Sequence, residues 1–170
     1  MNHQNIYLIG MPGVGKSYWA EQIAAHYGLQ CIDLDDMIEV RSGMKIGTFF
    51  ERFGEAEFRK LERETLQQVM QVFSKNTVVA CGGGTPCFYD NLAQMKAKGK
   101  VIYLKASLDT LYQHLSKETQ TRPLLRLPDW KEKLTEMLEK RNQIFGLADL
   151  IIDTESLSVA DFQPIISTGI

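Results

Sequence analysis

Five short apolar runs alternate along the chain with longer stretches in which apolar residues recur at helical spacing. The runs lie in IYLIG (residues 6–10), CIDL (31–34), TVVAC (77–81), VIYL (101–104) and DLIID (149–153). Apolar runs of this length predict buried strands. Because strands buried on both faces need helices on both sides, the alternation predicts an α/β fold with a mostly parallel sheet.

Between these runs, apolar residues three and four apart indicate helices. The pattern predicts a helix from Lys16 to Tyr27, helical structure from Asp35 to Phe73 with breaks near Gly43 and Gly54, and a helix over about residues 129–145. The polar segment SKETQTRPLLRLPD (116–129) contains two prolines and predicts a mobile loop. Since no internal repeat or linker divides the sequence, we expect one domain over residues 1–170.

Composition narrows the possible partners. Hydrophobic residues make up 44% and charged residues 24% of the 170, which is ordinary for a soluble globular protein with its own core. The net charge of −2 offers no general attraction to nucleic acid or anionic membranes, so any phosphate binding must be local. The apolar runs are too short to span a membrane, and MNHQNIYLIG lacks the basic start of a signal peptide. We expect neither a nucleic-acid nor a membrane partner.

The cysteines indicate a cellular compartment. Cys31, Cys81 and Cys87 are odd in number and have no CxxC spacing. This argues against a disulfide framework or a zinc site and favours a reducing cytoplasm. Cys81 stands before a glycine run and could be a thiol near a site, but we interpret it as a small buried apolar residue.

The segment GMPGVGKSY (10–18) carries the spacing of a phosphate-binding loop. Glycines let successive backbone N–H groups point at phosphate oxygens, and the predicted helix that follows adds its positive end. The lysine can bridge the outer phosphates, and the serine hydroxyl can ligate magnesium. The segment therefore predicts a nucleotide site. The candidate contacts are Gly13, Val14, Gly15, Lys16, Ser17 and Tyr18.

Two carboxylates follow the second apolar run. In CIDLDDMIE, Asp33 and Asp35 lie two residues apart, which on an extended strand places both side chains on the same side. Strand carboxyl ends face the ligand crevice of open α/β sheets, where one carboxylate could serve magnesium and the other an acceptor hydroxyl. The alternative is a helix N-cap with first-turn acids, a role that we assign to Asp36.

Three arginines and a triple glycine are further candidates. Arg59 has acidic residues four positions before it and three after it, which on local sequence favours a solvated ion-pair face. Arg122 and Arg141 also have structural explanations. The glycines of CGGGTP, Gly82–Gly84, are costly to order and expose backbone N–H groups. They favour a ligand that approaches the main chain closely.

Taken together, these motifs resemble the shikimate kinase family over nearly the whole chain. The resemblance rests on the loop at 10–17, followed by DLDDMIE, GEAEFRKLE, CGGGTP, RPLL, RNQIFGLAD and IIDT. It implies a three-layer P-loop kinase fold with a five-stranded parallel sheet, helices on both faces and a mobile lid over about residues 116–128. The implied reaction is transfer of the γ-phosphate of ATP to the 3-hydroxyl of shikimate, in aromatic amino-acid biosynthesis, by a magnesium-dependent monomer.

The resemblance also implies roles for individual residues on the ATP side. Lys16 would hold the phosphates, and Arg122 would come from the lid onto the transferred phosphate of ATP. Ser17 and Asp33 would serve magnesium. Because phosphoryl transfer has a loose transition state, such positioning and charge neutralisation outweigh proton removal.

On the acceptor side, the resemblance implies that Asp35 orients the hydroxyls of shikimate and can accept a proton. Arg59 and Arg141 would bind its carboxylate, helped by Gly82, Gly83 and Gly84. Arginine suits this task because its planar group donates two hydrogen bonds to a carboxylate, which lysine cannot do. The acceptor-binding helices would span about residues 35–73.

Four features depart from the family pattern. Tyr18 follows the loop serine where a second small hydroxyl residue is usual, and Phe145 stands at the place of a common tyrosine. Leu115 occupies the position of an arginine that stacks on adenine in many members, with Lys117 as the nearest basic residue. The lid also lacks the glycines seen in some members.

Two other functions remain open. Another small-molecule kinase of the same fold, such as a gluconate or nucleoside monophosphate kinase, would share the phosphate loop. The combination of Asp33 and Asp35 with EFRKLE and the triple glycine suits a carboxylated polyol better. A nucleotide-binding module without an acceptor would leave Arg59, Arg141 and the triple glycine with structural roles only. Loss of one of these arginines with no effect on activity would favour it.

Overall fold

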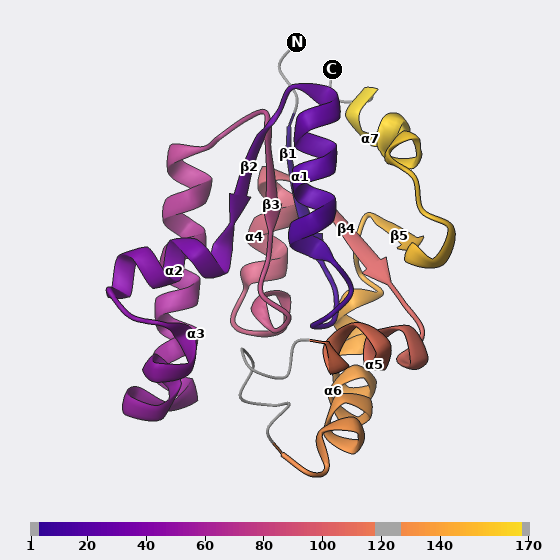
Figure 1. Cartoon of the computed structure of the whole chain (residues 1–170). Helices are drawn as coiled ribbons and strands as arrows, with labels where there is room; N and C mark the ends of the chain where they lie inside the picture. The colour runs from indigo at the N-terminus through magenta and orange to yellow at the C-terminus, as the bar shows by residue number, and fades with distance from the viewer. Residues whose placement is uncertain (1–3, 118–126, 168–170) are drawn as a thin grey trace.

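All five predicted strands lie in one sheet in the computed structural model, which describes residues 4–117 and 127–167 (Figure 1). The strands are β1 (Asn5–Ile9), β2 (Gln30–Asp33), β3 (Thr77–Ala80), β4 (Gly99–Lys105) and β5 (Leu150–Asp153). Every neighbouring pair is parallel, in the order β2-β3-β1-β4-β5. The predicted α/β fold with a five-stranded parallel sheet is confirmed.

The central strands form the middle of the apolar core. Every residue of β1 and of β3 is buried, whereas the edge strands β2 and β5 are partly exposed. Leu8 of β1 pairs with Ala80 of β3 on one side and with Ile102 of β4 on the other. Burial of each large apolar side chain contributes about 1.5–3 kcal/mol, so the strands with the most continuous apolar runs occupy the centre.

Helices cover both faces of the sheet, as predicted. They are α1 (Lys16–Tyr27), α2 (Leu34–Ser42), α3 (Ile46–Val72), α4 (Asn91–Lys98), α5 (Leu108–Ser116), α6 (Trp130–Phe145) and α7 (Gln163–Ser167), with the short 3-10 helices η1 (Thr85–Cys87), η3 (Thr154–Ser156) and η4 (Val159–Phe162). In Figure 1, α1 lies in front of the sheet and α4 behind it. Among the described residues, no helix combines the length and the apolar character needed to cross a membrane.

Glycines interrupt the long helical stretch at the predicted places. Gly43 ends α2 with a φ of 70°, and Gly54 bends α3 with a φ of 78° and a ψ of 176°. These values lie in a region of the backbone map that glycine adopts readily and other residues avoid. The predicted breaks near Gly43 and Gly54 are therefore confirmed.

One edge of the sheet gathers the predicted site residues. β1 leads into residues 10–15, β2 ends at Asp33, and β3 leads into residues 81–84. Because β2, β3 and β1 are parallel neighbours, their carboxyl ends meet at the same edge, where ligands bind in open α/β sheets.

The predicted lid lies mainly on residues 118–126, outside the described part of the chain. Arg122 lies there too. The lid and the role of Arg122 therefore stay predictions.

Candidate active site

The loop between β1 and α1 turns through three glycines with positive φ angles, Gly10 (148°), Gly13 (85°) and Gly15 (93°). Two of these positions are also crowded. A Cβ atom at Gly10 would lie 2.5 Å from the carbonyl oxygen of Leu104, and one at Gly13 would lie 2.7 Å from the Leu115 side chain. The loop therefore requires glycine for both its torsion angles and its packing, as expected of a backbone that binds phosphate.

Lys16 is the first residue of α1 and folds back over the loop. Its Nζ donates hydrogen bonds to the carbonyl oxygens of Gly10 and Met11, each at 2.9 Å. Gly15 caps this end of the helix and has no side chain to occupy the first amides. A cation, a helix N-terminus without a side-chain cap and the helix dipole thus coincide where the sequence predicts phosphate.

Val14 and Tyr18 contribute to this loop in different ways. Val14 is buried, and its N–H donates to the carbonyl oxygen of Met11 at 3.3 Å. Tyr18 is 58% exposed and meets the ring of Trp19 edge to face at 5.3 Å. Their predicted contacts with ATP stay predictions.

A hydroxyl and a carboxylate lie in contact beside the loop. Ser17 Oγ on α1 donates to Asp33 Oδ2 at the end of β2, at 2.5 Å. Ser17 is exposed and Asp33 half-buried, so both oxygens are within reach of a ligand. Mg²⁺ prefers oxygen ligands and commonly takes one or two from the protein and the rest from phosphate and water. This donor set fits a magnesium ion that accompanies a nucleotide.

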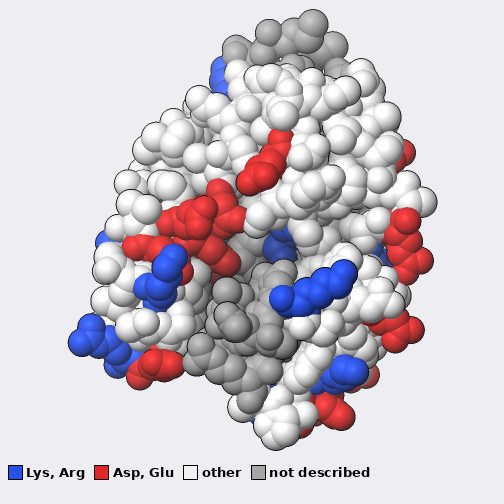
Figure 2. All heavy atoms as spheres, viewed as in Figure 1, with Lys and Arg blue, Asp and Glu red and all other residues white. Residues whose placement is uncertain are grey.

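The strand alternation predicted for Asp33 and Asp35 is wrong. β2 ends at Asp33, which is the N-cap of α2, and its carboxylate accepts a hydrogen bond from the Asp35 N–H at 2.9 Å. Asp35 and Asp36 lie in the first turn of the helix, where the dipole favours acidic residues. The first-turn role is confirmed for Asp36, and the capping role belongs to Asp33. In Figure 2, acidic side chains gather over this region, whereas basic ones stand apart from one another.

Asp35 nevertheless reaches the triple glycine, and every glycine of that loop has a side chain against it. A Cβ atom at Gly82 would lie 3.1 Å from Asp35 Oδ1, and one at Gly84 would lie 2.8 Å from the guanidinium of Arg59. Gly83 faces Pro12 of the phosphate loop in the same way, at 2.9 Å. The protein's own side chains therefore approach the main chain of this loop closely, and the predicted approach of a ligand stays a prediction.

Arg59 forms the predicted ion pairs, but the solvated face is wrong. Its side chain binds Glu62 at 2.9 Å and Glu55 at 3.1 Å. Arg59 is only 8% exposed and Glu62 only 1%. The guanidinium also stacks over the Phe88 ring, 4.1 Å from its centre. The sequence correctly indicated the pairing, but tertiary packing buries it.

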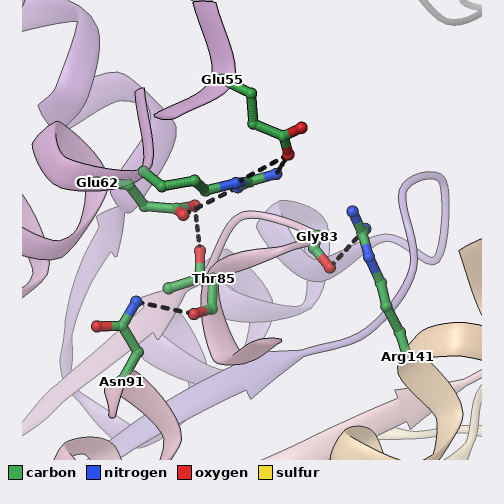
Figure 3. Close-up of polar contacts among 7 residues, drawn as sticks. Glu55, Glu62, Gly83, Thr85, Asn91 and Arg141 are labelled. Carbon is green, nitrogen blue, oxygen red and sulfur yellow. Dashed lines mark hydrogen bonds and ion pairs between the residues drawn. The ribbon is translucent and has the colours of Figure 1, made fainter. Parts of the chain in front are cut away.

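Arg141 reaches the same loop from α6. Its Nη1 donates to the carbonyl oxygen of Gly83 at 2.8 Å, and Figure 3 shows it approaching the glycines from the side opposite Glu62. Burial lowers the pKa of Arg141, and the nearby Arg59 guanidinium lowers it further. Two partly desolvated guanidiniums therefore lie near one another, an arrangement that favours an anion between them.

Two of the four family departures, Leu115 and Phe145, have structural explanations. Leu115 is fully buried against Gly13, so it belongs to the support of the phosphate loop. Phe145 is fully buried and stacks on Tyr103, with ring centres 4.9 Å apart. Lys117 caps the end of α5 and is exposed.

Sequence reasoning missed two contacts at this edge. His114 Nδ1 lies 2.8 Å from the carbonyl oxygen of Gly13, a partner 101 residues away. A carbonyl oxygen only accepts, so this ring nitrogen is the donor. Glu62 and Thr85 are buried together behind Arg59. No local signal marks His114, whereas the proximity of Thr85 to the glycine run was a signal for that residue.

The cysteines are free, as expected from their number and spacing. Burial raises the pKa of the Cys81 thiol strongly. Cys81 therefore stays protonated and packs as the small apolar residue that the sequence predicts.

The chain is similar to known proteins in both sequence and structure. The family model for shikimate kinase matches residues 12–168. The shikimate kinase of Thermodesulfovibrio yellowstonii is 36% identical over 155 residues, 91% of this chain and 88% of that protein. The crystal structure of shikimate kinase from Bacteroides thetaiotaomicron is similar with a TM-score of 0.89 and 32% identity, covering 96% of this chain and 98% of that one. The shikimate kinase of Acinetobacter baumannii, solved in complex with shikimate, has a TM-score of 0.87 and 30% identity, over 97% and 92%.

Proposed function

The chain belongs to the shikimate kinase family, and from that premise we propose how the carboxyl edge of its sheet transfers the γ-phosphate of ATP to the 3-hydroxyl of shikimate. The observation that carries the proposal is the pair of arginines at the glycine loop. Arg59 lies against Gly84 and Arg141 binds Gly83, with Asp35 against Gly82. A carboxylate and neighbouring hydroxyls are the groups that such a set recognises.

Arg59 and Arg141 bind the carboxylate of shikimate. Their guanidiniums are held by the surrounding protein before the substrate arrives, so little side-chain freedom is lost on binding. Asp35 accepts hydrogen bonds from the hydroxyls of shikimate and orients the one that attacks. Since the transition state is loose, this orientation matters more than removal of the proton, which Asp35 can also accept.

The phosphate loop binds ATP opposite the acceptor. Backbone N–H groups from Gly13 to Tyr18 surround the phosphates, and the Lys16 ammonium moves from its carbonyl partners onto them. Ser17 and Asp33 would hold the Mg²⁺ that accompanies the nucleotide. When bound, the ion neutralises charge on the outer phosphates.

The remaining parts of the proposal concern the whole chain. Arg122 reaches the transferred phosphate from a lid over about residues 116–128, and closure excludes the water that would otherwise hydrolyse ATP.

Residues 1–170 act as one domain, with acceptor-binding helices over about 35–73. The protein works as a monomer in the cytoplasm, a compartment supported by its free cysteines.

The test is a coupled assay of ADP release with magnesium and ATP. Shikimate is compared with quinate, gluconate and nucleoside monophosphates as acceptors. We expect stimulation by shikimate, with a product heavier by one phosphate. Turnover with gluconate or a nucleoside monophosphate alone would keep the kinase and overturn the acceptor. Tight ATP binding without turnover on any acceptor would instead identify a nucleotide-binding module.

A further inference from the structure

A chain of buried polar groups leads away from the guanidinium of Arg59, and Figure 3 shows its members Glu62, Thr85 and Asn91. Glu62 Oε2 accepts from Arg59 Nη1 at 2.9 Å, and Glu62 Oε1 accepts from the hydroxyl of Thr85 at 2.6 Å. Asn91 Nδ2 donates to the carbonyl oxygen of Thr85 at 2.9 Å. Thr85 is fully buried, and Glu62 and Asn91 are each 1% exposed. Side chains from α3 and α4 thus meet at η1.

The Glu62 carboxylate depends on two donors, the guanidinium of Arg59 and the hydroxyl of Thr85. A buried carboxylate oxygen that loses its hydrogen bond is unfavourable, since water cannot replace the donor. Oε1 also faces a second acid across Gly82, where a Cβ atom would lie 2.9 Å from Glu62 Oε1 and 3.1 Å from Asp35 Oδ1. The Thr85 hydroxyl satisfies Oε1 in this acidic surrounding and keeps Oε2 turned toward Arg59.

The backbone around Thr85 is held without its hydroxyl. The Thr85 N–H donates to the carbonyl oxygen of Gly82 at 3.1 Å, and its own carbonyl oxygen is bound by Asn91. Removing the hydroxyl therefore leaves the turn after the triple glycine in place. The loss falls on Glu62 and, through it, on Arg59.

We propose that Thr85 is a positioning residue for the acceptor site, whose hydroxyl holds Glu62 and thereby aligns Arg59 with the carboxylate of the acceptor. Thr85 is buried, so it acts through Glu62 and does not touch the substrate. The proposal rests on the proposed function, because it takes Arg59 to bind the shikimate carboxylate.

The test replaces Thr85 by an isosteric residue without a hydroxyl. In Thr85→Val we expect the KM for shikimate to rise about tenfold, the effect of one charge-assisted hydrogen bond. The KM for ATP and kcat should stay within about twofold, since the phosphate loop is not part of this network. Thr85→Ser keeps the hydroxyl donor, so its KM for shikimate should equal that of the unmodified protein.

Thr65 supplies the matched control. Like Thr85, it is a buried threonine, but it lies in α3 and its hydroxyl donates to the carbonyl oxygen of Leu61 at 2.7 Å. Thr65→Val should leave the KM for shikimate unchanged, even where both valine variants lower the melting temperature. If Thr85→Val does not fold, Thr85→Cys keeps a small side chain with a weak donor and should also raise the KM for shikimate.

A double-mutant cycle tests the route through Glu62. In a Glu62→Gln background, Thr85→Val should lose most of its effect on the KM for shikimate, because the aligned carboxylate is already absent. An undiminished effect in that background would overturn the proposal, as would an unchanged KM in Thr85→Val or an equal rise in both KM values. The proposed function fails separately, by absence of shikimate-dependent ADP release in the unmodified protein.

Discussion

The two sides of the site are held in shape by different means. On the nucleotide side (residues 10–18 with Asp33), glycine torsion angles shape the loop, and Lys16 is bound by backbone carbonyl oxygens. Ser17 is exposed to solvent there. On the acceptor side (Asp35, Arg59, Gly82–Gly84 and Arg141), the support is a set of buried side chains, with Glu62 only 1% exposed.

This difference predicts how each side fails. A backbone-built loop is sensitive to an added Cβ atom, because neither its torsion angles nor its packing can adjust. A site built from buried ion pairs is sensitive to geometry even when charge is conserved, because each oxygen and N–H group has a specific partner. The following variants test the contrast.

The largest effect is expected from Arg122, the predicted ATP contact that lies outside the described residues of both sides. Arg122→Ala should lower kcat by about a thousandfold or more, the usual contribution of an arginine that stabilises the transferred phosphate. Shikimate affinity, measured by calorimetry without ATP, should stay within about twofold. Arg126→Ala, in the same segment, is the charge-matched control. Unchanged turnover in Arg122→Ala would remove this residue from the mechanism.

On the nucleotide side, Gly13→Ala should raise the KM for ATP by roughly 100-fold, since strain of this kind costs about 1–3 kcal/mol. The residue has a φ of 85°, and the new Cβ atom would lie 2.7 Å from Leu115. The KM for shikimate should not change. Gly28→Ala is the matched control, with a φ of 67° and no atom within 4 Å of the new Cβ. Gly28→Ala should lower the free energy of unfolding and leave the KM for ATP and the KM for shikimate unchanged. If Gly13→Ala behaved in the same way, the contrast between the two sides of the site would be contradicted.

On the acceptor side, Arg59→Lys should raise the KM for shikimate about tenfold although the charge is kept. Lysine cannot bind Glu55 and Glu62 while presenting two parallel N–H groups to a carboxylate. Arg63→Lys, one turn along α3, is the control, because Arg63 pairs with Asp90 in a partly exposed position. Steady-state kinetics with varied shikimate measures both. Equal behaviour of the two variants would mean that burial of the ion pairs does not matter.

The contrast also explains which parts of the molecule the sequence predicted. Glycines at the ends and bends of helices, such as Gly28, Gly43 and Gly54, act within a few residues, so the element boundaries were predictable. The phosphate loop was predictable for the same reason, because its geometry depends on the spacing of neighbours in one segment.

The sequence indicated which residues gather on the acceptor side but not how these residues are buried and paired. The burial of Arg59 depends on Phe88 and the triple glycine, far away along the chain, and local charge spacing carries no information about such packing. Asp35 was misplaced on a strand because the change from strand to helix at Asp33 depends on a cap rather than on hydrophobic periodicity. Thr85 was missed because its partner, Glu62, comes from another helix.

The smallest effect is expected in the scaffold that both sides share. Asp149 accepts a hydrogen bond from the Val101 N–H at 2.8 Å and pairs with Lys96 at 3.1 Å. Burial raises the pKa of Asp149, but these two contacts outweigh it and leave the pKa below its usual value. Asp149→Asn should lower the free energy of unfolding by about 1 kcal/mol at neutral pH, as measured by urea unfolding.

The lowered pKa of Asp149 determines how the stability difference between the unmodified protein and Asp149→Asn changes with pH. Above the usual aspartate pKa of 3.8 the carboxyl of Asp149 is ionised in both the folded and the unfolded chain, so its contacts stabilise the fold fully. As the pH falls through the lowered pKa of the folded state, the carboxylate is protonated and this contribution disappears. The difference between the unmodified protein and Asp149→Asn should therefore be constant near neutrality and shrink below about pH 3.8. Both KM values should stay the same, because the contact lies in the scaffold. A change in the KM for shikimate or for ATP would mean that one side of the site depends on the contact between Asp149 and Val101 of β4. The shape of that side would then not be set by its own residues alone.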